Sequence, residues 1–409
     1  MNKRFFRCLL LTFVCLAAPV LAQAYDFWVD GICYNILSFE DRTCEVTHNG
    51  SNSYQNFVDV PSTVDYNGRT YRVLGIGDRA FYGCRNLEDL TIAEGVTYIG
   101  ANAFSQLRNI TSLTLPTSLD SIASNAFSNN SDLTSLTLKG QSVVLDDYAF
   151  SSCTGLKTLS VKGNVRRIGE GCFDHCSLLA AMTIPSGVET IGENAFLCCY
   201  ALTSFKVSAD NAFFMAKGGV LFDKQQATLV AFPNGKEGSY VIPSGVTTIA
   251  DGAFAGSKLL TKLTIPGSVS VIGFAAFNRC QSLTNIINLA VLPQEVRDDT
   301  FATYGKLHVL SSSKSAYRAD EVWSRFTIMG DAVDTTPAAF AADDDIRITS
   351  HSGVLQVVGI PTGAILSVCD VQGKLLWQSA VQSGSAHVAL PTGHVYIIKV
   401  QDKTFKFKI

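Results

Sequence analysis

The chain has 409 residues, of which 47% are hydrophobic, and its 32 basic and 35 acidic side chains leave a formal net charge of -3. This length and hydrophobicity indicate a folded protein of about two or three domains and exclude a disordered chain. The balanced charge provides no basic surface for nucleic acid or an anionic membrane, so we expect neither as a partner.

Residues 1–24 have the organisation of a secretory signal peptide. Basic residues precede an apolar run at 8–20, and Ala22-Gln23-Ala24 forms a small-residue cleavage site. The run is too short for a comfortable transmembrane span, and no later stretch has the roughly twenty apolar residues that a span requires. We therefore expect an exported mature chain that begins at Tyr25 and has no transmembrane span.

Residues 25–72 predict an N-terminal β cap. Strand-like alternation at Cys33–Leu37 and Thr43–Thr47 surrounds a turn-like segment at Glu40–Arg42. A stacked array that follows needs such a cap, because an open sheet edge would pair with other chains.

A 23-residue period organises residues 73–330. Its most regular marker is phenylalanine, and the spacing is constant from the first marker to the sixth (104 − 81 = 23): Phe81, Phe104, Phe127, Phe150, Phe173 and Phe196, with Phe254 and Phe277 after a gap. Apolar residues recur six and nine positions after these Phe residues, and eleven positions after all of them except Phe277; the last two positions alternate with a polar residue as in a β-strand. One coil cannot bury this stripe alone, so the coils must stack.

The period predicts an α/β solenoid, mostly β, whose strands form a parallel sheet. We expect the glycines at 100, 169, 192 and 273 to allow a tight turn, and the Ala-Phe segment after each to form one or two helical or 3₁₀ turns.

Twelve extra residues lie between Phe196 and Phe254 (58 = 2 × 23 + 12). Strand-like runs at Gly219–Phe222 and Thr228–Phe232 predict an inserted hairpin near 208–238 that projects from the solenoid. Aromatic residues at 305–330 predict a closing cap. A linker at 331–345 and a small β-sandwich at 346–409 follow, because short strands there alternate with glycine and proline turns.

Ten of the twelve cysteines lie in the mature chain. Five of them fall three residues after a repeating Phe, which predicts small buried side chains: Cys84, Cys153, Cys176, Cys199 and Cys280. Disulfides between Cys198 and Cys199, or between Cys33 and Cys44, stay open as alternatives.

The repeat units resemble a known family. Ala195–Leu202 and Ile184–Gly192 are similar to the BspA-like leucine-rich repeats of surface proteins from Bacteroidetes and related microbes. The resemblance implies a curved solenoid displayed outside the cell, and some members of the family bind host matrix proteins or other bacteria.

The C-terminal region resembles the sorting domain of the type IX secretion system, at Asp370–Lys374 and Leu390–Tyr396. The resemblance implies recognition by an outer-membrane export machine and surface attachment. The matching residues are Gly373, Pro391, Gly393, Tyr396 and Lys399. An accessory β-domain is the alternative. In the linker, Asp334-Thr335-Thr336 resembles a short O-glycosylation acceptor motif.

No catalytic constellation is recognisable in the sequence. The six histidines are scattered, without an H-E-x-x-H motif or the His–Cys spacing of a zinc site, and G-x-S-x-G and Walker motifs are absent. Gly75–Ala80 nominally matches a dinucleotide fingerprint, but it is a repeat turn one period before Ile99 and Gly100. We expect no enzyme activity, no cofactor and no metal.

The candidate ligand face is the row of polar residues that points outward from the strands: Thr91, Thr114, Thr137, Ser160, Thr183, Lys206 and Thr264. A threonine ladder can also stabilise a sheet without any ligand, and that alternative stays open. The sequence predicts an exported, non-catalytic surface scaffold for adhesion or protein recognition. The alternative is a glycan-binding or structural envelope component in which the solenoid is a spacer.

Overall fold

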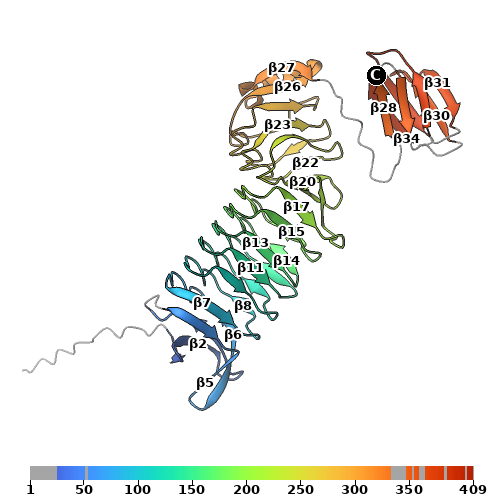
Figure 1. The fold of residues 1–409 in the computed structure, drawn as a ribbon. Helices are drawn as coiled ribbons and strands as arrows, with labels where there is room; N and C mark the ends of the chain where they lie inside the picture. The colour runs from blue at the N-terminus through green and yellow to red at the C-terminus, as the bar shows by residue number, and fades with distance from the viewer. Residues whose placement is uncertain are drawn as a thin grey trace, which may run out of the picture.

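The computed structural model describes residues 25–50, 54–332, 347–351, 354–358, 364–381, 385–400 and 403–408. The predicted signal peptide and residues 333–345 of the predicted linker, including Asp334-Thr335-Thr336, lie outside these residues. From residue 32 to residue 332 the strands stack into an elongated column (Figure 1). The column is almost entirely β, which confirms the predicted fold class.

The column begins with antiparallel strands. β1 (Phe27–Val29), β2 (Ile32–Ser38) and β3 (Thr43–Thr47) form a meander, and β5 (Thr63–Tyr66) and β6 (Arg69–Ile76) form a hairpin. β6 pairs in parallel with β3, so it offers a parallel edge to the coil that follows. β4 (Asn56–Val60) offers a second parallel edge.

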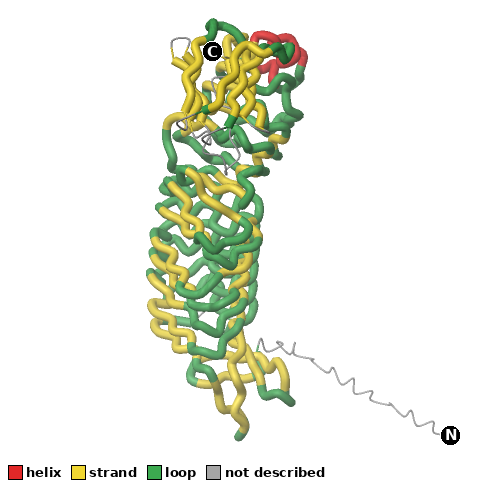
Figure 2. Tube along the Cα trace, turned by 90° about the vertical axis from the view of Figure 1, so that its right-hand side faces the viewer, coloured by secondary structure: helices red, strands yellow, loops and turns green. Residues whose placement is uncertain are grey.

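Each regular coil contributes one strand to each of two stacks, which run along two sides of the column (Figure 2). The main stack continues from β4 through β7 (Leu87–Ile92), β9 (Ser112–Thr114), β11 (Ser135–Leu138), β13 (Thr158–Val161), β15 (Ala181–Ile184) and β17 (Ser204–Val207). The second stack continues from β6 through β8 (Tyr98–Ile99), β10 (Ser121–Ile122), β12 (Val143–Leu145), β14 (Val165–Ile168) and β16 (Thr190–Ile191). Paired strands are parallel and offset by one period, as Leu113 with Leu136 shows.

A column of phenylalanine rings runs through the core. From Phe81 to Phe196 the neighbouring rings stack with centroids between 5.0 and 5.8 Å apart. Stacked aromatic rings at this spacing bury a large apolar area and attract one another. The aliphatic residues at the strand positions pack around them and are buried.

The corners around each Phe are tight turns, so the predicted helical or 3₁₀ turns are wrong. The residues two before and two after Phe127, Asn125 and Asn129, have φ of 58° and 61°, and the pattern recurs from coil to coil. A left-handed residue on each side interrupts any helical run. The Phe127 N–H instead donates to the Ala149 carbonyl of the next coil at 2.8 Å.

The glycines before these corners are required by close packing between coils. A Cβ on Gly169 would lie 2.5 Å from the Asp146 carbonyl carbon, and a Cβ on Gly192 would lie 2.4 Å from the Glu170 nitrogen. Neither glycine has a left-handed φ. The prediction that glycine is needed at these positions for the backbone conformation of a tight turn is therefore wrong.

The insertion is part of the core and does not project. β18 (Phe214–Lys217), β19 (Val220–Asp223) and β20 (Thr228–Ala231) form an antiparallel meander. Val220, Leu221 and Phe222 are fully buried, and β20 joins the second stack by pairing in parallel with β22 (Thr248–Ile249). The prediction of a projecting hairpin is wrong because Phe232 is itself a repeat Phe. Its ring stacks on that of Phe254, with the ring centroids 4.9 Å apart.

The coil of Phe232 has a shortened corner. Phe232 follows Leu229 by three residues, whereas Phe254 follows Ile249 by five. The buried side chains accordingly divide into two clusters, one up to Phe214 and Leu221 and one from Val220 onward. We call the junction between the coil of Phe196 and the coil of Phe232 the stack break.

Beyond the stack break both stacks continue. Their strands are β21 (Gly238–Val241), β23 (Leu260–Ile265), β25 (Asn285–Asn288), β26 (Lys306–Leu310) and β27 (Thr327–Ala332) in the main stack, and β22 and β24 (Val271–Ile272) in the second.

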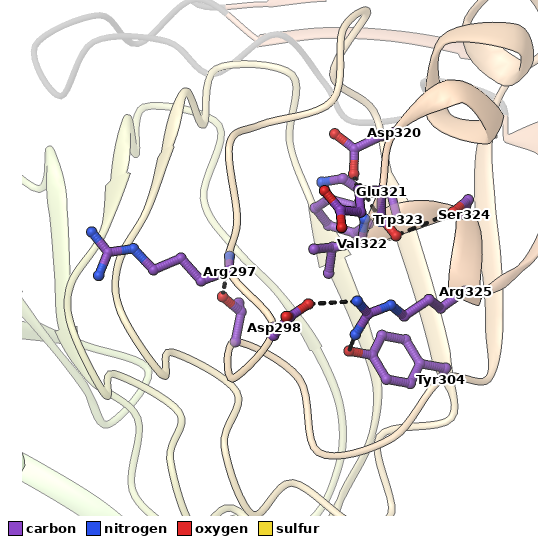
Figure 3. A network of polar contacts seen from close by, with 10 residues as sticks. Arg297, Asp298, Tyr304, Asp320, Glu321, Val322, Trp323, Ser324 and Arg325 are labelled. Carbon is purple, nitrogen blue, oxygen red and sulfur yellow. Dashed lines mark hydrogen bonds and ion pairs between the residues drawn. The ribbon is translucent and has the colours of Figure 1, made fainter.

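A short helical segment closes the column, with η1 (Ser311–Ser313), α1 (Lys314–Ala319) and η2 (Trp323–Arg325). Trp323 is fully buried, and its indole N–H donates to the Gln294 carbonyl at 2.9 Å. Figure 3 shows the Arg325 guanidinium between Asp298, at 2.5 Å, and the Tyr304 hydroxyl, at 3.3 Å. Trp323 and Phe326 pack edge-on against the ring of Phe301 and cover the apolar end of the last coil.

The C-terminal region has two small antiparallel sheets. One contains β28 (Arg347–His351), β29 (Val354–Val358) and β32 (Ser385–Ala389), and the other contains β30 (Ile365–Cys369), β31 (Leu375–Ala380), β33 (Val395–Val400) and β34 (Lys403–Lys408). Buried residues of both sheets, such as Leu355 and Ile398, form a single apolar cluster that is separate from the solenoid core.

All ten cysteines in the described residues are buried and none forms a disulfide. The thiol of Cys153 donates to the Phe127 carbonyl at 3.1 Å, and the thiol of Cys280 donates to the Phe254 carbonyl at 3.0 Å. The repeated cysteine therefore links adjacent coils as a small apolar side chain with one hydrogen-bond donor.

The phenylalanine column gives a test of the stacking energy. We expect Phe127→Ala to lower the free energy of unfolding by about 3–5 kcal/mol, because it leaves a cavity between two rings. Chemical denaturation followed by circular dichroism measures the loss. Leu178 is 47% exposed, and Leu178→Ala should cost less than about 0.5 kcal/mol. Equal losses in the two variants would contradict the proposed role of the column.

The buried thiols predict a loss of stability in alkali. Burial raises the pKa of Cys153 and of Cys280 from 9.0 to about 12. Above pH 9.0 the unfolded chain releases these protons and the folded chain retains them, so the free energy of unfolding falls as pH rises, by about 1.4 kcal/mol per unit for each thiol. Denaturation at a series of alkaline pH values should show a smaller slope for Cys153→Ala. An unchanged slope would refute this assignment.

Candidate recognition surface

The predicted ligand face lies on the outer side of the main stack. Thr137 is in register with Thr114 on one side and with Ser160 on the other, and Thr183 is in register with Lys206. These five residues therefore form two groups of direct neighbours.

The two remaining residues have other partners. Thr91 is in register with Asp59 of the N-terminal cap, and its hydroxyl donates to the Asp59 carboxylate. Thr264 lies between Val241 and Ile287 beyond the stack break. The main stack separates into distinct sheets between β7 and β9, between β13 and β15, and at the stack break, so the row is not one continuous ladder.

A hollow of about 350 Å³ opens on this face between β7 and β9, and its walls include Thr91, Thr114 and Lys139. At its edge the Glu94 carboxylate accepts hydrogen bonds from the hydroxyl and the N–H of Thr117, at 2.7 and 2.9 Å. These bonds, the hydroxyl first, lower the pKa of Glu94. The hollow therefore has a fixed negative charge at its edge at neutral pH.

Most charged side chains on the main-stack strands are acidic at the N-terminal end and basic farther along, with Asp331 on β27 as an exposed acidic exception. Exposed acidic residues lie at its N-terminal end: Asp59, Glu88, Asp89 and Glu94. Exposed lysines lie on or beside the later strands: Lys162, Lys206, Lys262 and Lys306. Such separation of charge orients a partner during encounter and favours one docking direction.

The end of the main stack beyond the stack break is more apolar than the sequence suggested. Val241 is 55% exposed and Met329 is 38% exposed, and Ile287 lies between Thr264 and His308 in the same outward row. Sequence reasoning missed these residues because it followed the repeated threonine. Counting 23 residues back and forward from Thr264 would have found Val241 and Ile287, whereas Met329 lies 21 residues after His308 and falls outside the period.

The stack break contains a cavity of about 340 Å³ lined by Ile191–Leu197 on one side and Thr248–Gly252 on the other. In the preceding coil the N–H groups of Gly171 and Phe173 donate to carbonyls of the next coil, at 3.0 and 2.8 Å. The equivalent N–H groups of Asn194 and Phe196 have no such partner in the described part of the chain, because the next coil lacks two corner residues.

The described residues contain one cluster of metal-ligand type, formed by Asp174, His175 and Cys198. Their ligand atoms lie within 4.8 Å of one another. The sequence search looked for local His–Cys spacing and could not see this group, because His175 and Cys198 are one period apart.

In the C-terminal domain, the residues that match the sorting-domain pattern lie at turns and on β33. Gly373 and Gly393 have φ of 86° and 82° in exposed turns. Tyr396 is buried, and its hydroxyl donates to the Pro391 carbonyl at 2.8 Å, so these two residues fix the turn before β33. Lys399 is exposed on that strand.

No helix of the described residues is long and apolar enough to cross a membrane. A comparison with functionally curated proteins gives no match.

Several solved structures are similar to this chain. A leucine-rich cell surface protein from Faecalibacterium prausnitzii A2-165 is 24% identical with a TM-score of 0.53, over 74% of this chain and 93% of that chain. The pneumococcal vaccine antigen PcpA is 19% identical with a TM-score of 0.45, over 76% of this chain and 100% of that one. A leucine-rich repeat protein from Eubacterium ventriosum ATCC 27560 is 21% identical with a TM-score of 0.44, over 70% and 78%. The first likeness shows a shared fold.

The model of the BspA type leucine rich repeat region matches residues 74–213 and 230–321 in six copies, which is more than half of the chain. The match covers the coils whose phenylalanine column and strand register are described above. The chain belongs to the BspA-type leucine-rich repeat family.

Proposed function

We propose that this chain is a non-catalytic scaffold that works at or outside the cell surface and recognises a protein ligand through the outer face of its main stack. The observation that carries the proposal is the extended face with an acidic end, the hollow between β7 and β9, and a basic region farther along. Repeat solenoids commonly bind partners over such extended surfaces. The similarity to a leucine-rich cell surface protein supports the proposed location.

Reversing charge at the acidic end tests this face. We expect the double variant Glu88→Lys and Asp89→Lys to weaken binding to the ligand by about tenfold at low salt, mainly through slower association. The measurement is surface plasmon resonance of the mature protein against individually immobilised extracellular-matrix proteins. Raising the salt concentration should reduce the difference, because it screens exposed charges.

Glu189 provides the matched control. It is exposed beside β16 on the second stack, so Glu189→Lys should leave binding unchanged. Equal effects of the two reversals would contradict the assignment to the main stack. Saturable binding to immobilised glycans, with no binding to any matrix protein, would favour the second candidate, a glycan-binding or envelope component with the solenoid as spacer.

We also propose that residues 346–409 direct the chain to the cell surface, as a sorting domain of the type IX kind does. The separate apolar core of this domain and the turn fixed by Tyr396 and Pro391 support an independent recognition unit. Leu375 and Leu376 on the edge strand β31 are 51% and 45% exposed, and they offer an apolar contact to an export machine.

Truncation after Gly330 tests the sorting role. We expect the full-length chain at the cell surface, accessible to added protease, and the truncated chain retained inside the outer membrane. Cell fractionation with surface digestion measures both. Surface display of the truncated chain at the normal level would show that the domain is an accessory module.

A further inference from the structure

His175 and Cys198 occupy equivalent corners of adjacent coils. They are 23 residues apart, each lies two residues after a repeat Phe, and each has a left-handed backbone, with φ of 58° and 59°. The His175 N–H donates to the Leu197 carbonyl at 2.8 Å, which holds the two corners together. The fold therefore fixes the two side chains as neighbours.

The side chains form a compact polar group. Nδ1 of His175 lies 2.7 Å from Oδ1 of Asp174, and the thiol of Cys198 lies within 4.8 Å of both ligand groups. Cys198 is fully buried, the Asp174 side chain is 18% exposed, and the His175 side chain is 44% exposed. The group is thus anchored in the core on its sulfur side and open to solvent on its imidazole side.

Arg279 reaches this group from a coil beyond the stack break. Its Nη1 lies 3.5 Å from the Cys198 sulfur. Of the two coils between them, that of Phe254 has Gly256 at the equivalent corner, where a Cβ would lie 3.3 Å from the Cys198 nitrogen and 3.3 Å from Oδ1 of Asn234. That Asn234 oxygen is buried and has no hydrogen-bond partner. The region around Cys198 is therefore an exception to the regular packing between coils.

We propose that Asp174, His175 and Cys198 bind one divalent transition-metal ion of the zinc type. Thiolate, imidazole and carboxylate are the ligands that zinc uses in proteins, and a thiolate disfavours magnesium and calcium. Three protein ligands leave a fourth position, which faces solvent beside the exposed imidazole. Zinc bonds of about 2.0–2.3 Å place the ligand atoms of a tetrahedral site roughly 3.2–3.8 Å apart, so the sulfur and the other two groups must approach by about 1 Å while Nδ1 and Oδ1, now 2.7 Å apart, separate slightly. Rotation of the Asp174 and His175 side chains can supply this movement.

Arg279 has a supporting role at this site. Its Nη1 donates a hydrogen bond to the Cys198 sulfur at 3.5 Å, which holds that side chain in the geometry of the cluster. The two anionic ligands together outweigh its single positive charge.

The proposed ion links two coils next to the stack break. There the backbone N–H groups of Asn194 and Phe196 have no acceptor in the next coil among the described residues, so this corner of the coil of Phe196 makes fewer backbone bonds to the next coil than the corners before it. A metal bridge from Cys198 back to Asp174 and His175 strengthens that side. Its function is to stabilise the end of the first core cluster.

Cobalt(II) titration of the mature, chelator-treated protein tests the site. We expect one cobalt ion per chain, with a thiolate-to-cobalt charge-transfer band and the intense visible bands of four-coordinate cobalt. Zinc should displace cobalt, and magnesium or calcium should not. Zinc should also raise the thermal unfolding midpoint, because an ion that binds only the folded chain stabilises it.

Substitutions in the cluster distinguish cobalt binding at this site from cobalt binding elsewhere on the protein. Cys198→Ser should abolish the charge-transfer band, and His175→Asn should weaken cobalt binding by at least about 100-fold. The matched control is His308→Asn. His308 also lies 2.7 Å from an aspartate, Asp331, but without a neighbouring cysteine. This variant should bind cobalt as the parent does.

Circular dichroism of each metal-free variant checks folding, and His175→Asn remains informative if the cysteine variant does not fold, since its side chain is partly exposed. Absence of a thiolate band in the parent protein, or full retention of cobalt binding in His175→Asn, would overturn the proposal.

Discussion

Every part of the solenoid depends on one constraint, which is that a single coil cannot bury its own apolar residues. Each coil is covered by the coil before it and the coil after it, and the ring-to-ring distances of 5.0–5.8 Å in the phenylalanine column show how closely they approach. The constraint also explains the glycine at Gly169 and the thiol of Cys153. The glycine lets two backbones meet, and the thiol bonds to the carbonyl of the preceding coil. Stability in such an array is close to a sum of neighbour contacts.

The same constraint explains why the sequence predicts the fold well. Phe127 and Leu136 repeat because every coil presents the same buried positions, so counting alone places them in the core. Local conformation is less predictable. The left-handed residues at Asn125 and Asn129 distinguish a corner from a helical turn, yet the same corners contain Ser152 and Arg279, whose residue types do not favour that conformation. Contacts between neighbouring coils determine these corners, and single-coil propensity does not.

The recognition surface was predicted only in part for a related reason. Selection for stacking acts on inward positions, whereas outward positions vary from coil to coil. Thr114, Thr137 and Ser160 were found because they happen to repeat, and their register places them side by side. Val241 and Met329 do not repeat the threonine, although they occupy the same row, so their exposure became visible only in the structure. Residues that recognise a ligand are expected to differ from the residue that repeats at their position, so a search for repeated residues misses them.

The stack break shows what happens where contacts between neighbouring coils are missing. A coil that loses two corner residues leaves the N–H groups of Asn194 and Phe196 without an acceptor in the described part of the chain, and in a chain stabilised by neighbour contacts this weakens the interface between the two coils. Next to this weak interface the corner row, elsewhere occupied by residues such as Asn129 and Ser152, contains His175 and Cys198, and Arg279 crosses over Gly256 to reach them. The backbone bonds between the coils of His175 and Cys198 are intact, and it is the small residue Gly256 at the next corner that leaves space for Arg279 to reach Cys198. Specific chemistry in a repeat protein is therefore best sought where the repeat fails.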